Sequence, residues 1–108
     1  MKVDEILRAK GHEVVTTPRH ASVARLCERL RQERIGALVV SADGRTVDGI
    51  VTEREIVHAI ARHGAPAFDM RAVDVMMRSV RTCTSGDRVR DVMIVMTRAR
   101  VRHLPVVD

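Results

Sequence analysis

Apolar residues recur at helical spacing in two separate segments of the chain. Both sets stand at positions i, i+3, i+4 and i+7, and they are Val23, Leu26, Cys27 and Leu30 and, at a constant offset of 66 residues, Val89, Val92, Met93 and Met96. This spacing places the four side chains of each set on one face of an α-helix. The pattern therefore predicts two amphipathic helices that bury matching faces.

Short apolar segments flank each predicted helix. They cover residues 14–16 and 36–40 around the first helix, and residues 80–82 and 103–107 around the second. Because these segments are rich in β-branched and aliphatic residues, they favour strands. Each half of the chain is therefore predicted to begin strand–helix–strand.

The two halves also align with each other directly. At the offset of 66, residues 14–40 lie over residues 80–106 without a gap, and the identical pairs are Val14/Val80, Thr16/Thr82, Val23/Val89, Arg34/Arg100, Leu38/Leu104 and Val40/Val106. A fixed internal offset indicates a repeated structural unit. We therefore interpret the chain as two copies of one unit.

The first copy continues beyond its second predicted strand. Asp43 and Gly44 are typical of a hairpin turn, and residues 47–51 follow as a third predicted strand. Residues 53–63 are predicted to form a second helix, which Gly64 ends. The apolar stripe of that helix is Ile56, Val57 and Ile60. The order of the repeat is therefore β-α-β-β-α.

The second copy has no counterpart of residues 47–63. Without that strand and helix, its last strand would expose the apolar surface around Leu104 and Val106. We therefore expect either that the natural chain continues beyond Asp108 or that a second molecule covers this surface.

A similar short segment precedes each copy. Residues 3–7 stand before the first, and a loop with Pro66 followed by a short helical segment stands before the second. In that helical segment Val73, Met76 and Met77 are expected to pack. We accordingly assign residues 1–68 to the first repeat and residues 69–108 to a second, incomplete repeat.

Composition limits the classes of protein to consider. Hydrophobic residues make up 45% of the 108 residues and charged residues 31%, and Phe68 is the one aromatic residue, so we expect a single domain with an aliphatic core. No apolar run approaches the roughly 20 residues of a membrane span, and the first residues are too polar for a secretory signal, which favours the cytoplasm. The net charge of +5 attracts anions.

Reactive side chains form no recognisable catalytic or metal-binding pattern. Cys27 and Cys83 belong to no CxxC pair, so both are interpreted as reduced thiols, and the five histidines lack metal-ligand spacing. We find no GxSxG, no Cys–His pairing and no carboxylate pair placed for acid–base work. The sequence therefore predicts neither an enzyme nor a metal site.

Two motifs, together with the repeat, carry a family resemblance. GIVTERE at residues 49–55 follows the predicted hairpin, and RHLPVVD stands at residues 102–108. With the β-α-β-β-α order, the chain resembles a tandem cystathionine-β-synthase (CBS) domain pair, or Bateman module, of the stand-alone kind. The resemblance implies an α+β fold in which two repeats pack with pseudo-two-fold symmetry, the second truncated after its second strand.

The resemblance also implies a function. CBS pairs are regulatory modules that bind adenine nucleotides such as AMP, ADP, ATP or NAD(H) in clefts between the repeats, and no catalytic cofactor is expected. Many form homodimers, often as a flat disc of four repeats. We therefore expect a nucleotide sensor that acts by rearranging its dimer or a partner.

The resemblance also implies which residues bind the nucleotide, by matching the family's motif to positions of this sequence. The family's G-h-h-T-x-x-D pattern falls on residues 49–55, so that Thr52 would bond phosphate and Glu55, in place of Asp, would bind ribose. Arg102 and His103 match basic residues that approach phosphate in relatives. The full predicted set is Val15, Thr16, Gly36, Ala37, Leu38, Thr52, Arg54, Glu55, Arg81, Thr82, Arg102, His103 and Pro105.

Other interpretations of the same residues stay open. Thr52 followed by acidic residues is also typical of an ordinary capped helix, and the chain would then be a structural dimerisation module whose cleft binds nothing. Residues 88–102 are rich in arginine and could contact nucleic acid, but their apolar stripe favours a core helix with a solvated basic face. Nucleic acid is therefore the weaker alternative.

Overall fold

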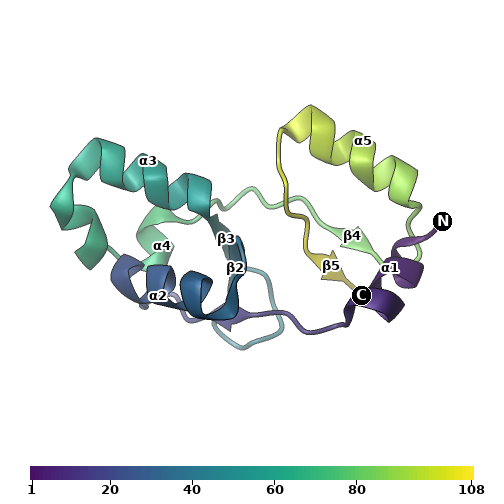
Figure 1. The fold of residues 1–108 in the computed structure, drawn as a ribbon, viewed down its shortest axis with the longest axis horizontal. Helices are drawn as coiled ribbons and strands as arrows, with labels where there is room; N and C mark the ends of the chain where they lie inside the picture. Colours follow the sequence, from purple (N-terminus) through teal and green to yellow (C-terminus); the bar gives the residue numbers. More distant parts are fainter. The chain divides into compact units, whose positions relative to one another are not determined.

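The computed structural model describes residues 1–108 and divides them into two compact units (Figure 1). Unit 1 consists of Met1–Glu13 and Arg81–Asp108, and unit 2 is Val14–Val80. Helices and short strands alternate in both, so the predicted α+β class is confirmed. The assignment of repeats to residues 1–68 and 69–108 stays a prediction.

Unit 2 is built on a three-stranded sheet. Its strands are β1 (Thr16–Thr17), β2 (Ala37–Val40) and β3 (Gly49–Thr52), in the order β1-β2-β3. β1 runs parallel to β2, as a strand–helix–strand crossover requires, and β3 returns antiparallel after the hairpin. The predicted strands at residues 14–16 and 47–51 are each shifted by one or two residues, because pairing with β2 sets their bounds.

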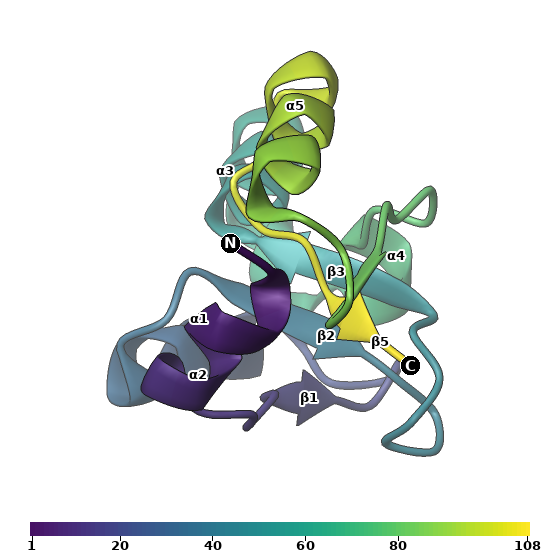
Figure 2. The same ribbon diagram turned by 90° about the vertical axis from the view of Figure 1, so that its right-hand side faces the viewer.

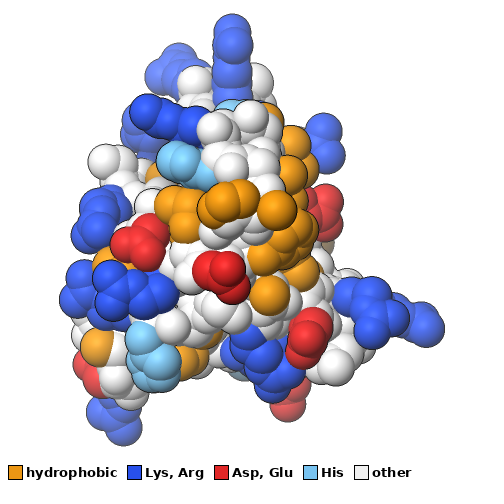
Figure 3. Space-filling view, turned by 90° about the vertical axis from the view of Figure 1, so that its left-hand side faces the viewer, with side chains coloured by type: hydrophobic (Ala, Val, Ile, Leu, Met, Phe, Trp, Pro, Cys, Tyr) orange, Lys and Arg blue, Asp and Glu red, His pale blue; other side chains and the backbone are white.

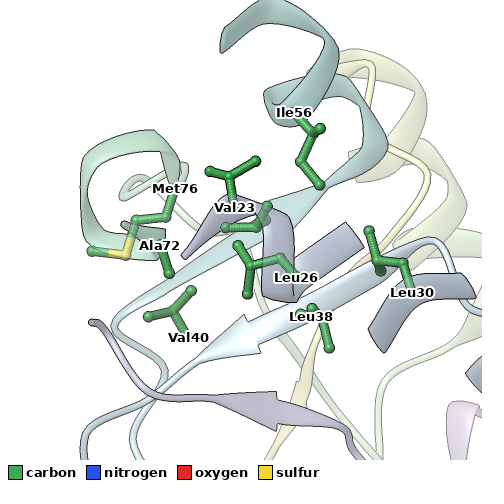
Figure 4. Packing of buried hydrophobic residues seen from close by; sticks show 9 residues of the cluster. Val23, Leu26, Leu30, Leu38, Val40, Ile56, Ala72 and Met76 are labelled. Atoms are coloured by element: carbon green, nitrogen blue, oxygen red, sulfur yellow. The ribbon is translucent and has the colours of Figure 1, made fainter. Parts of the chain in front are cut away.

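Three helices and one short 3₁₀ segment complete unit 2. They are α2 (Val23–Glu33), α3 (Glu53–His63), η1 (Ala65–Asp69) and α4 (Ala72–Val75). Figure 4 shows side chains of α2, α3 and α4 pointing toward Leu38 and Val40 of β2. The buried cluster is Val23, Leu26, Leu30, Leu38, Val40, Val51, Ile56, Ala72 and Met76.

The apolar stripe predicted for α3 is partly wrong. Ile56 and Ala59 are its buried residues, whereas Val57 is 59% exposed. Ile56 and Ala59 stand three residues apart and share the inward face of the helix. Val57, one residue further round the helix from Ile56, turns toward solvent.

The chain after α4 closes the free edge of β3. The backbone N–H of Ile50 donates to the Met77 carbonyl at 3.0 Å, and the N–H of Met77 donates to the Ile50 carbonyl at 2.9 Å. This approach requires glycine next to Ile50, because a Cβ on Gly49 would lie 2.5 Å from Met76 Sδ and 2.9 Å from the Met77 carbonyl oxygen. Both edges of β2 are therefore paired, and the outer edge of β3 is paired at Ile50.

Unit 1 has a smaller sheet. Its elements are α1 (Val3–Lys10), β4 (Cys83–Thr84), α5 (Val89–Ala99) and β5 (Val106–Val107), and β4 pairs parallel with β5 alone. The strands predicted at residues 80–82 and 103–107 are thus shifted or shorter. α1 joins this unit through its start: the Val3 N–H donates to the Asp87 carbonyl at 2.9 Å, and the Val89 N–H donates to the Met1 carbonyl at 3.0 Å. Figure 2 shows α1, β5 and α5 facing the viewer.

The two units match element by element, but not at one constant offset. α2 and α5 begin at Val23 and Val89, 66 residues apart. The strand pairs Thr16↔Val39 and Cys83↔Val106 correspond at an offset of 67. The gapless alignment is therefore wrong by one residue at the strands, and Thr82 and Cys83, not Arg81 and Thr82, correspond to Val15 and Thr16.

Candidate functional site

The GIVTERE segment forms the joint between β3 and α3. Thr52 is the last residue of the strand and the N-cap of the helix, and its Oγ1 accepts from the Arg54 N–H at 3.2 Å. Glu55 reaches back: its Oε1 accepts from the Thr52 backbone N–H at 2.8 Å and from the Thr52 hydroxyl at 2.6 Å. The two residues therefore form a capping box, which satisfies free donors at the start of the helix.

This geometry limits what the two side chains can offer to a ligand. A threonine hydroxyl has one proton, and here Glu55 receives it. Thr52 can donate to a phosphate only after that bond breaks. Both hydrogen bonds to Glu55 end on Oε1, so Oε2 remains able to accept from a ligand hydroxyl.

The ends of the three strands of unit 2 meet near this joint. Ala37 is the sheet partner of Thr52, and the Glu53 N–H donates to the Gly36 carbonyl at 3.3 Å. On the other side of β2, the Val39 N–H donates to the Val15 carbonyl at 3.2 Å. The eight predicted residues that this corner of unit 2 brings together are Val15, Thr16, Gly36, Ala37, Leu38, Thr52, Arg54 and Glu55.

One residue at this corner escaped the sequence prediction. The Arg29 guanidinium donates from Nη1 to the Thr16 carbonyl and from Nη2 to Glu33 at 3.2 Å, and its side chain is only 23% exposed. Arg29 lies three residues after Leu26, at the border of the apolar stripe of α2. That position was the available signal, since a cation there lies beside the first strand.

The remaining five predicted residues belong to unit 1. Arg81, Thr82, Arg102 and His103 are exposed, whereas the Pro105 carbonyl accepts from the Cys83 N–H at 3.0 Å and so helps to pair β4 with β5. Unit 1 holds no counterpart of the β3–α3 joint. One corner of the Thr52–Glu55 kind is therefore present in the chain.

Both thiols are packed, Cys27 against the core cluster of unit 2 and Cys83 in the interior of unit 1. Cys27 and Cys83 are both free, and burial raises the pKa of each thiol above its ordinary value. No group of three or more His, Cys, Asp or Glu side chains is placed to hold a metal ion.

The hairpin between β2 and β3 contains the most perturbed carboxylate. Backbone N–H groups of Thr46 and then Arg45 donate to Asp43 and hold the pKa of its carboxyl well below the usual range. Gly44, at φ 79°, completes the turn, as its sequence predicts. These bonds order the loop, and Asp43 is exposed, so the lowered pKa reflects hydrogen bonding within a turn and not a buried charge.

The charges of unit 2 do not form a continuous basic surface on the face that Figure 3 shows. Lys and Arg side chains are spread around the rim, with acidic side chains between them and apolar side chains near the centre. A nucleic-acid surface ordinarily presents clustered cations along one face. None of the helices is both long and apolar enough to cross a membrane.

Comparison with known proteins identifies relatives along the whole chain. A CBS-domain protein from Agrobacterium tumefaciens has a solved structure that matches with a TM-score of 0.96 and 33% sequence identity, over 100% of this chain and 86% of that one. A CBS domain protein from Pyrobaculum aerophilum, solved in complex with AMP, matches with a TM-score of 0.84 and 24% identity, over 100% and 79%. At that identity the second likeness shows the fold alone.

A curated relative supports the same grouping. A 17.7 kDa protein of Acidianus ambivalens is 29% identical over 106 residues, which cover 98% of this chain and 61% of the relative. The chain thus spans less than two thirds of that relative's length. The sequence model of the CBS domain matches twice, at residues 3–62 and 72–108. The chain therefore belongs to the CBS domain family and contains a pair of CBS repeats.

Proposed function

We propose that the chain is a regulatory module that binds an adenine nucleotide, such as AMP, ADP, ATP or NAD(H), at the β3–α3 corner of unit 2. The observation that carries this proposal is the gathering of eight predicted residues around Thr52 and Glu55. Membership of the CBS family and the AMP held by the Pyrobaculum protein support it. The net charge of +5 favours an anionic ligand.

Each part of a nucleotide has a chemical partner at this corner. Glu55 Oε2 can accept from the ribose hydroxyls while Oε1 continues to cap α3. The half-buried side chains of Val15 and Ala37 offer an apolar edge for the base, whereas the side chain of Leu38 is fully buried in the core. Thr52 and Arg54 supply the phosphate contacts, with Thr52 exchanging its bond to Glu55 for one to the phosphate.

The exchange at Thr52 gives the ligand a means of acting on the protein. A ligand shifts a conformational equilibrium only if it binds one arrangement better than the other. Here the bound arrangement is the one in which the Thr52 hydroxyl turns away from Glu55, which alters the first turn of α3. We propose that the change is transmitted to a homodimer, as in a disc of four repeats, or to a partner protein.

Titration calorimetry with AMP, ATP and NADH tests the proposal. Glu55→Gln keeps a capping acceptor but replaces the free carboxylate oxygen, so the affinity should fall by about tenfold. Thr52→Ser retains both the hydroxyl and the cap and should bind like the parent, whereas Thr52→Ala should bind more weakly. Absence of heat with all three nucleotides, or unchanged affinity in Glu55→Gln, would contradict nucleotide binding at this corner.

A structural dimerisation module is the second candidate, and the capping box favours it. Thr52 and Glu55 already satisfy each other, which is sufficient reason for both residues to be present. The discriminating variant is Glu55→Asp, which restores the family's carboxylate length. If the parent binds nothing and Glu55→Asp gains affinity while the oligomeric state stays the same, the second candidate is correct.

A further inference from the structure

The first strand of unit 2 is short and lies at an edge of its sheet. β1 consists of Thr16 and Thr17 and pairs with β2 alone. On the β2 side, the Val39 N–H donates to the Val15 carbonyl at 3.2 Å, and the Ser41 N–H donates to the Thr17 carbonyl at 3.0 Å. Carbonyl groups alternate in direction along a strand, so the Thr16 carbonyl between these two points to the open edge.

Arg29 of α2 occupies this open edge. Its Nη1 donates to the Thr16 carbonyl, and its Nη2 donates to Glu33 Oε2 at 3.2 Å. The Arg29 side chain is 23% exposed, whereas Arg25, one turn earlier on α2, is 56% exposed and forms an ion pair with Glu28. A partly buried bond from a cation to a carbonyl is stronger than a solvated ion pair. Arg29 therefore ties β1 to α2, and Glu33 holds the guanidinium in place.

Unit 1 has no equivalent of this bond. At the offset of 66, Val95 of α5 corresponds to Arg29, and a valine side chain has no donor. Unit 1 also lacks a counterpart of the Thr52–Glu55 corner. The arginine therefore occurs in the unit that contains the proposed site, on the strand segment where Val15 would lie against the base.

We propose that Arg29 is a positioning residue for the base of the bound nucleotide, an inference that rests on the proposed function for the identity of the ligand. By holding the Thr16 carbonyl, Arg29 fixes the first strand before the ligand arrives. The adjoining Val15 then meets the base with little further loss of conformational freedom, which favours binding. Arg29 acts through the strand and needs no contact with the nucleotide.

The order of the sheet confines this effect to one part of the ligand. β1 lies on one side of β2, and β3, which ends at Thr52, lies on the other. Thr52 and Glu55 hold each other through their own hydrogen bonds, at 2.6 and 2.8 Å, which do not involve β1. A looser β1 should therefore weaken the contacts with the base and leave those with the ribose and the phosphate unchanged.

Amide hydrogen exchange of the ligand-free chain, measured by NMR, tests the hold on the strand. Arg29→Met keeps an unbranched aliphatic side chain but removes every donor. The amides of Val39 and Ser41, whose acceptors lie on the first strand segment, should exchange about tenfold faster. The amides of Ile50 and Met77, bonded to each other on the far side of the sheet, should exchange as in the parent. Unchanged exchange at Val39 and Ser41 would overturn the proposal.

Titration with AMP and with ribose 5-phosphate, followed by amide chemical shifts, tests the effect on binding. Arg29→Met should bind AMP about threefold to tenfold more weakly, and should bind ribose 5-phosphate, which lacks the base, like the parent. Arg29→Lys keeps a cation that can donate to the Thr16 carbonyl and should restore most of the affinity for AMP. The control is Arg25→Met, which removes the solvated ion pair with Glu28 and should match the parent in both measurements.

The two ligands separate failure of this proposal from failure of the proposed function. If the parent binds AMP and Arg29→Met binds it equally well, the positioning role is wrong while the proposed function stands. Equal losses of affinity for AMP and ribose 5-phosphate would also overturn the role, because they would show a general loosening of the site. If the parent binds no adenine nucleotide, the proposed function fails, and the role of Arg29 in binding fails with it.

Discussion

Helices α2 and α5 have the same length and the same apolar spacing, yet only α2 buries residues of its apolar face. α2 places Val23 and Leu26 at 0% exposure and Leu30 at 8%, whereas no residue of α5 is buried. Unit 2 supplies β3, α3 and α4 around its helix, and unit 1 supplies a two-stranded sheet and α1. An amphipathic pattern therefore specifies which face of a helix can be buried, and the neighbouring elements decide whether that face is buried.

The sharpest contrast between the units is expected at two glycines. Gly49→Ala should lower the free energy of unfolding by about 3 kcal/mol, because the new Cβ meets Met76 and the Met77 carbonyl, and the backbone of β3 must shift. Gly86→Ala in unit 1 meets nothing within 4 Å and should change stability by less than about 0.5 kcal/mol. Urea unfolding measures both, and equal losses would contradict the closeness of packing at β3.

The matched valines of the two helices test burial directly. Val23→Ala removes two methyl groups from a side chain at 0% exposure and should cost about 2 kcal/mol. Val89→Ala makes the same chemical change at a half-buried position and should cost less than about 1 kcal/mol. The measurement is again urea unfolding. If both variants lose the same stability, α5 is better packed than we describe.

The N-caps of the same helices give a smaller effect of opposite sign. Ser22 Oγ accepts from the Arg25 N–H at 3.2 Å, whereas Arg88, its counterpart at the start of α5, makes no side-chain cap. Ser22→Ala should lose about 1 kcal/mol, and Arg88→Ser should gain up to about 1 kcal/mol. Thermal unfolding followed by circular dichroism reports both changes. A destabilising Arg88→Ser would show that the arginine has another role there.

The smallest expected effect lies in the first strand of each unit. Thr17 is 2% exposed and its Oγ1 has no hydrogen-bond partner, so Thr17→Val should gain about 0.5–1 kcal/mol. Thr84 occupies the same strand position in unit 1 but is exposed, so Thr84→Val should be neutral. Loss of stability in Thr17→Val would mean that the hydroxyl has a partner in solution.

Helix bounds were predictable because their signals are local. Thr52 and Gly64 define α3 at residues 53–63 as predicted, and the apolar stripes locate α2 and α5. Strand bounds were not, because β1 and β4 are two residues long and their extent depends on pairing with β2 and β5. The packing of α1 in unit 1 was also not predictable, because it depends on backbone hydrogen bonds of Val3 and Val89 that join residues far apart in the sequence.

The candidate site was predictable in position but not in detail. Motif and repeat together located the corner at Thr52 and Glu55. The sequence could not show that Glu55 folds back to cap Thr52, because both a cap and a ribose contact use the same residue types at the same spacing. Arg29 was missed although its position at the border of the apolar stripe of α2 was a signal, because a cation beside an apolar stripe is also typical of a solvated helix face.

The two units differ in the number of nucleotide sites that each can form. Unit 2 has a Thr52–Glu55 corner and unit 1 has no counterpart, so the chain should bind one nucleotide. Calorimetric titration of the parent chain with AMP at saturating concentration measures this stoichiometry. We expect one site per chain, with an affinity that falls by about tenfold in Glu55→Gln. Two equivalent sites per chain, or no binding of any adenine nucleotide, would contradict it.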